Sequence, residues 1–149
     1  MISDETGGVH SQDILLSSER LQVIFHLTVE LSLLPGDLLA KYGLRQSDVD
    51  GLVAILRPMR ERVGELGNMR LGIIKKDLEG WDGIMAPNFD STGHADKMTV
   101  EMTESMVGAW RNALESTVTS WLGERELFLR TGYSMEEAYE AIGRLRFPS

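Results

Sequence analysis

The sequence contains no cysteine. This absence excludes disulfide bonds, thiolate nucleophiles and cysteine-ligated metal sites, and it agrees with a reducing compartment. We therefore expect a cytoplasmic protein. Histidine is scarce, and none of the spacings typical of zinc ligands occurs among His10, His26 and His94. The sequence accordingly predicts no metal and no cofactor.

Long apolar runs are also absent. The N-terminal segment "MISDETGGVHSQD" lacks the basic region and the apolar run of a secretory signal. The apolar-rich stretch "LQVIFHLTVELSLL" carries a histidine and a glutamate and is too short to span a bilayer. We therefore expect no membrane contact.

Basic residues are outnumbered by acidic ones. The 149-residue chain has 15 Lys and Arg against 23 Asp and Glu, which leaves a formal net charge of −8. A negative field repels phosphate, so the composition disfavours nucleic acid as a partner. The acidic surface suits either a basic protein partner or simple solubility. The length suffices for one domain with a substantial core.

Helical patterns dominate what is present. No segment shows convincing strand alternation, so the sequence predicts an all-α fold: a single-domain bundle of about five to seven helices over residues 17–149, after a polar N-terminal arm at 1–16. Ser17 is the expected N-cap of a helix that stops at Pro35-Gly36. The stretch "MRERVGELGNMRLGIIKKDLEGW" is expected to be helical with breaks at its glycines. Residues 80–98 follow neither period and are predicted to form one long central loop.

A long helix is predicted over residues 99–131, with Thr99 as its N-cap. Apolar residues recur there at about 100° per residue. They are Val107, Trp110, Leu114, Val118, Trp121 and Phe128. Gly132 should end this helix, and "SMEE" is a capping box in which Ser134 is the N-cap and Glu137 lies three residues on.

A second stripe on this predicted helix combines small and adaptable side chains. It comprises Met102, Met106, Ala109 and Ala113. Small residues allow another backbone to approach, and methionine fills irregular surfaces. The stripe indicates either a central helix packed on two sides or a contact face for a partner or a second copy. On the latter interpretation, these four residues bind a partner, and the chain is a non-enzymatic adaptor, regulator or homo-oligomeric assembly subunit.

The stretch "LLAKYGLRQSDVDGL" has the spacing of a helix-turn-helix. With Gly43 at the turn, apolar residues occupy the positions at which two helices pack: Leu38, Leu39, Leu44, Val49 and Leu52. Over about twenty residues the chain resembles the helix-turn-helix family. The resemblance implies an alternative function as a DNA-binding regulator that uses residues 38–57, with Arg45, Gln46 and Ser47 as contacts.

The stretch "LFLRTGYSMEEAYEA" repeats this spacing at residues 127–141. A glycine C-cap followed by a capping residue and an acidic first turn is also the general pattern of a tight corner between helices. Carboxylates in the first turn repel phosphate. We therefore favour a corner over DNA recognition for both stretches.

The predicted loop suggests a third function. Its segment "DSTGHAD" contains residue types that can act as nucleophile, base and orienting carboxylate: Asp90, Ser91, His94 and Asp96. Catalytic triads are normally held by separate rigid elements, and these residue types are common in turns. A small enzyme or ligand-binding protein that uses loop 80–98 is thus a further alternative, and no catalytic residue is assigned.

Overall fold

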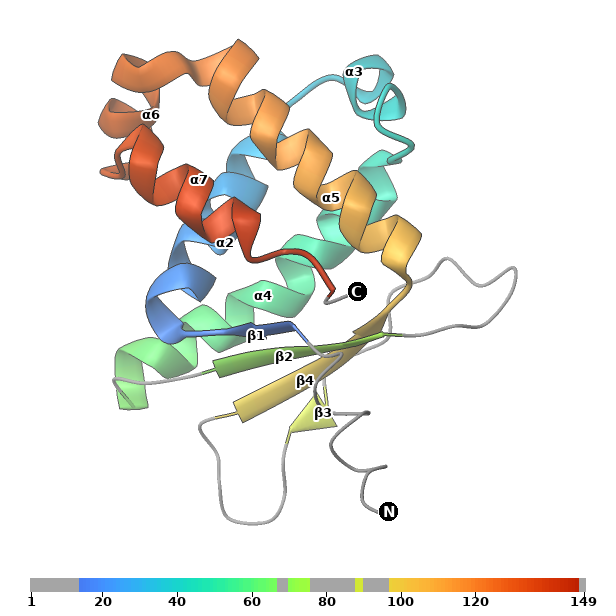
Figure 1. The fold of residues 1–149 in the computed structure, drawn as a ribbon, viewed down its shortest axis with the longest axis vertical. Helices are drawn as coiled ribbons and strands as arrows, with labels where there is room; N and C mark the ends of the chain where they lie inside the picture. Colours follow the sequence, from blue (N-terminus) through green and yellow to red (C-terminus); the bar gives the residue numbers. More distant parts are fainter. Residues whose placement is uncertain (1–13, 67–69, 76–87, 90–96, 148–149) are drawn as a thin grey trace.

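The computed structural model describes residues 14–66, 70–75, 88–89 and 97–147. The strands are β1 (Ile14–Leu16), β2 (Arg70–Lys75), β3 (Asn88–Phe89) and β4 (Lys97–Met102). The helices are α2 (Ser18–Ser32), α3 (Gly36–Ala40), α4 (Gln46–Leu66), α5 (Glu104–Ser116), the π-helical η1 (Thr117–Leu122), α6 (Gly123–Thr131) and α7 (Met135–Gly143). In Figure 1 the helices gather on one side of the sheet, above its strands.

The strands form a small sheet in the order β1-β2-β4-β3. The central pair β2 and β4 is parallel, whereas β1 and β3 run antiparallel to their neighbours. Ile14, Ile73 and Val100 align across three strands and are buried. Leu15 points to the other side and is exposed, as the twofold period of a strand requires. The described part of the chain is therefore mostly helical with a small sheet, and "all-α" is only an approximation.

The sheet corrects several sequence-based assignments. Residues 70–75 and 99–102, which were expected to be helical, are strands. Thr103, not Thr99, is the N-cap of α5, and its Oγ1 accepts a hydrogen bond from the backbone N–H of Met106 at 3.1 Å. Residues 14–16 of the expected polar arm form β1. Of the predicted loop 80–98, the described residues 88–89 and 97–98 are in strands, and the rest, with the "DSTGHAD" segment, lies outside the described residues.

Trp110 on α5 lies at the centre of the core with no exposed surface. Its indole Nε1 donates a hydrogen bond to Thr28 Oγ1 at 3.1 Å, and the threonine hydroxyl donates to the Ile24 carbonyl at 2.7 Å. The two polar groups are therefore satisfied although they are buried. This chain of hydrogen bonds joins α5 to α2. In Figure 1, α2 lies behind α5 and α7.

The segment after α5 departs from regular α-helix. Residues 117–122 form η1, whose wider turns add residues relative to an α-helix, and Gly123 then adopts a φ of 73°. The apolar period predicted for one continuous helix therefore no longer identifies the buried side chains from η1 onward. Trp121 is 46% exposed and Phe128 is 60% exposed, whereas Leu127 is buried.

Two glycines with left-handed backbone make the corners between helices. Gly43 lies between α3 and α4 with φ 79°, and Gly132 lies between α6 and α7 with φ 80°. At the second corner the predicted capping box is confirmed. Ser134 Oγ accepts from the Glu137 N–H at 3.1 Å, and Glu137 Oε1 accepts from the Ser134 N–H at 3.0 Å. Ser17 is likewise confirmed as the N-cap of α2.

Candidate protein-contact surface

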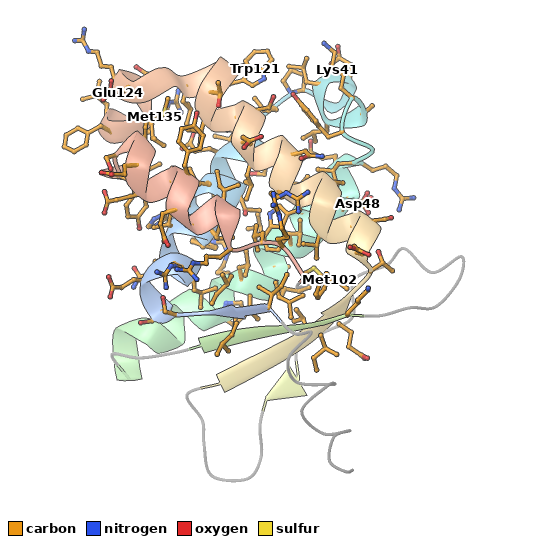
Figure 2. All side chains as sticks on the ribbon, in the orientation of Figure 1. Lys41, Asp48, Met102, Trp121, Glu124 and Met135 are labelled. Atoms are coloured by element: carbon orange, nitrogen blue, oxygen red, sulfur yellow. The ribbon has the colours of Figure 1, made fainter. Side chains whose placement is uncertain are left out.

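The structure assigns the predicted partner-binding stripe to the interior. Met102, Met106 and Ala113 are buried, and Ala109 is half-buried against the same core. Met102 ends strand β4 while Met106 belongs to α5, so the four residues do not share one helix face. Figure 2 shows Met102 beneath the first turn of α5, between the helices and the sheet. The small and adaptable side chains therefore serve the packing of α5 on two sides.

The predicted DNA-contacting side chains are engaged with the chain's own acids. The exposed Arg45 guanidinium contacts Asp48, with Nη2 3.2 Å from Oδ1. Gln46 Nε2 donates to the Ser32 carbonyl and to Asp50 Oδ1, both at 3.1 Å. These contacts occupy the side-chain N–H donors of Arg45 and Gln46, which would have to be free in order to bind the edges of bases.

Ser47, the third predicted DNA contact, lies near the start of α4. The helix begins at Gln46, and the Arg45 carbonyl accepts hydrogen bonds from the N–H groups of Asp48 and Val49. Ser47 therefore lies in the first turn. Partial burial acts to raise the pKa of Asp48, but hydrogen bonds from Arg45 outweigh it and the pKa is lowered. The first turn thus carries a charged carboxylate at neutral pH.

Large apolar side chains are exposed at a few places in the described part of the chain. They are Leu15, Leu33, Trp121, Phe128, Leu129 and Tyr139. Phe128 and Leu129 are neighbours on α6, 60% and 66% exposed. Together with Glu124, Arg125 and Ser134 they line a shallow hollow of about 350 Å³. We name Glu124, Arg125, Phe128 and Leu129 the α6 patch.

The local sequence explains why this surface is apolar. Three successive large side chains, Leu127 to Leu129, spread over about 200° of a helix and cannot all face one core. Leu127 takes the buried position. Phe128 and Leu129 then fall on the outer side, one turn after Glu124 and Arg125. Figure 2 places Glu124 at the outer edge of the helical layer.

The charges of the α6 patch are free of partners inside the described structure. Neither Glu124 nor Arg125 has an ion pair among the described residues. Elsewhere on α6, by contrast, Arg130 contacts Glu126 and also Glu30 of α2, each at 3.2 Å. Arg130 therefore links α6 to α2, and the α6 patch lies on the other side of α6 with one unpaired charge of each sign.

A second hollow, of about 400 Å³, lies between α2 and α7, and the Glu140 carboxylate in its lining is paired with two arginines. Arg20 Nε lies 2.6 Å from Glu140 Oε1, and Arg144 Nη2 lies 3.0 Å from Glu140 Oε2. The hydrogen bonds from Arg20 and then Arg144 lower the pKa of Glu140. This cluster is a link between two helices. Nowhere in the described residues do three or more His, Asp or Glu side chains gather as a metal site.

The chain matches no protein-family model, no curated protein and no solved structure. None of the helices in the described ranges is long and apolar enough to cross a membrane. Inferences about function therefore depend on the surface geometry described above.

Proposed function

We propose that the protein is non-enzymatic and acts through protein–protein contact, as an adaptor, regulator or assembly subunit, and that the α6 patch is its contact surface. The observation that supports this proposal is the pair of adjacent, largely exposed side chains Phe128 and Leu129. Apolar surface in water is unfavourable by about 25 cal/mol per Å². Aromatic residues and arginine are enriched in protein interfaces, and Arg125 lies beside this pair.

The fold does not depend on these two side chains. Leu127 supplies the buried contact of α6, and the Arg130–Glu30 ion pair links the helix to α2. A charged residue at position 128 should therefore leave the folded structure intact while it removes the contact surface. The cytoplasmic location stays a prediction from the sequence.

A matched pair of variants tests this proposal. Phe128→Glu places a charge in the α6 patch, and Leu33→Glu places the same charge at an equally exposed leucine at the end of α2. We expect the wild-type protein and Leu33→Glu to retain the same binding partner in pull-downs from the native cell. We expect Phe128→Glu to lose it. Retention of that partner by Phe128→Glu at wild-type yield contradicts the proposed surface.

The DNA-binding alternative makes a separate prediction. Because the donors of Arg45 and Gln46 contact carboxylates of α4, we expect no binding of duplex DNA at physiological salt. A mobility-shift assay measures this. Saturable, sequence-dependent binding that is lost in the double variant Arg45→Ala, Gln46→Ala would reverse our ranking of the two functions.

A further inference from the structure

A hollow of about 270 Å³ lies where the segment that follows α7 passes the first turns of α5 (Figure 1). It is lined by Glu104, Val107, Gly108, Arg111, Arg146 and Phe147. Two of these side chains are arginines, although the protein as a whole carries a net charge of −8. The hollow is therefore a local concentration of positive charge on an acidic protein.

The fold fixes the positions of the two arginines. Arg111 Nη1 donates a hydrogen bond to the Leu145 carbonyl at 3.0 Å, which joins α5 to the segment after α7. This hydrogen bond uses one of the five N–H donors of the guanidinium. Leu145 and Phe147 are buried, whereas Arg146 between them is exposed. Both guanidinium groups thus belong to elements that are held against the core.

The charges of these arginines are not compensated within the described part of the chain. Neither Arg111 nor Arg146 has an ion pair among the described residues. The carboxylate in the lining belongs to Glu104, and its Oε1 lies 3.5 Å from Lys75 Nζ. The Leu145 carbonyl that Arg111 contacts is neutral. The hollow therefore presents two guanidinium charges that lack a countercharge in the described structure.

Gly108 leaves the space beside Arg111 open. A Cβ atom at this position would meet only Arg111 Nη2, at 3.9 Å. A guanidinium binds the oxygen atoms of carboxylates and phosphates through pairs of parallel N–H groups. A carboxylate carries one negative charge, whereas a phosphate monoester carries about 1.5 to 2 negative charges at pH 7. Two guanidinium groups therefore match the charge of a phosphate monoester better than that of a carboxylate.

We propose that this hollow binds the phosphate group of a phosphate monoester, which lies between the guanidinium groups of Arg111 and Arg146. The site is separate from the α6 patch, so the inference goes beyond the proposed function. The net charge of −8 repels extended polyanions such as nucleic acid, so the ligand is a single phosphate group. A free phosphate ester and a phosphorylated side chain of another protein share this chemistry.

Titration of the full-length protein with phenyl phosphate, followed by NMR of the backbone amides, measures this binding. The chemical-shift changes should concentrate at residues 104–111 and 145–147. Acetate at the same ionic strength should bind at least about tenfold more weakly, because it carries less charge and fewer acceptor oxygens. Equal affinity for the two anions, or shift changes spread over the whole surface, contradicts the proposed site.

A matched pair of charge removals tests the role of the guanidinium groups. Arg146→Gln removes one of the two charges of the hollow at an exposed position, so the fold should be unaffected. Its affinity for phenyl phosphate should fall at least about fivefold. Arg125→Gln removes the same charge from α6, outside the hollow, and should change the affinity by less than about twofold. Equal weakening in both variants would mean a general effect of net charge and would overturn the proposal.

A steric variant tests the hollow without any change of charge. Gly108→Leu places a large side chain in the open space beside Arg111, and leucine favours a helix more than glycine does. The variant should remain folded in thermal melts, and its affinity for phenyl phosphate should fall at least about fivefold. Wild-type affinity in a folded Gly108→Leu protein contradicts binding in this hollow.

A peptide that contains one phosphoserine between neutral residues distinguishes the two sources of the phosphate group. Binding at least about tenfold tighter than that of phenyl phosphate, and weakened by Arg146→Gln, identifies a phosphorylated protein as the source. Equal affinity for the peptide and phenyl phosphate identifies a free phosphate ester. If neither probe binds more tightly than acetate, the phosphate site is wrong, while the proposed function of the α6 patch is unaffected.

Discussion

Helices α5 and α6 come from one stretch of sequence with one apolar period, yet they have different environments. Trp110 and Trp121 lie about three helical turns apart and were expected to share one face. The first has no exposed surface, and the second is 46% exposed. The difference arises in the backbone between them, because η1 begins at Thr117 and changes the phase of the helix before Trp121. An apolar period therefore identifies a buried face only as far as the α-helix is continuous.

The largest effect should come from a charge placed on the buried side of α5. Ala113→Glu would bury an unpaired carboxylate in the core, and we expect it to lower the free energy of unfolding by at least about 3 kcal/mol or to prevent folding. Ser120→Glu, on the exposed part of η1, should change it by less than about 0.5 kcal/mol. Urea denaturation measures both. Equal effects of the two substitutions would contradict the difference in burial between α5 and η1.

Truncation of the two tryptophans is the most direct comparison. Trp110→Ala should cost about 3–5 kcal/mol, because it leaves a cavity in a close-packed core. Trp121→Ala should cost less than about 1 kcal/mol, since its side chain is already partly in water. Thermal and urea unfolding of the two variants give the difference. A cost of Trp121→Ala as large as that of Trp110→Ala would show that η1 is packed more tightly than described.

A smaller effect should follow from loss of the buried hydroxyl. Thr28→Val preserves shape but leaves the Trp110 indole N–H without its acceptor, so we expect a loss of about 1–3 kcal/mol. Thr119→Val removes a hydroxyl that contacts Tyr139 at 2.6 Å on the exposed side of η1, and it should cost less than about 0.5 kcal/mol. Chemical denaturation and tryptophan fluorescence distinguish the pair. No loss in Thr28→Val would mean that water reaches the indole.

The smallest effect concerns pH at the link between α2 and α7. Hydrogen bonds from Arg20 and Arg144 lower the folded-state pKa of Glu140 below its ordinary value of 4.5. Its stabilisation is therefore present above that ordinary value and disappears as pH falls through the lowered one. The stability difference between wild type and Glu140→Gln should be small near neutral pH and vanish in strong acid. A difference that grows on acidification would mean that the protonated form is the stabilised one.

Three helix-boundary signals were reliable in the sequence because they act over a few residues. Ser17, Gly132 and the Ser134 capping box each determine a helix boundary through contacts three or four positions away. The sheet lacks such signals. Strand β2 contains a glycine among apolar residues, and its hydrogen-bond partners lie far away in the chain at β1 and β4. A short apolar run of this kind suits a strand or a buried helix equally well.

The candidate contact surface was only partly accessible to sequence reasoning. The sequence placed Phe128 on the apolar face of one continuous helix, because the helical period was extended through Gly123 without a break. The run Leu127–Phe128–Leu129 did contain a usable signal, because three adjacent large side chains cannot all face one core. Which of them points inward depends on the phase of α6, and that phase follows from η1. The position of the α6 patch therefore required the structure.

The pairing of β1 with β2 has a consequence for synthesis of the protein. Leu16 pairs with Leu71, and Ile14 with Ile73, so β1 lacks its β2 partner until the middle of the chain has left the ribosome. At about 5–20 residues per second, this interval lasts several seconds. During it, two side chains that are buried in the finished sheet are in water, beside an α2 that still lacks its α5 and α7 contacts. Molecular chaperones that bind apolar segments of nascent chains would therefore find their target at residues 14–31 early in translation, and lose it once β2 and α5 have been made.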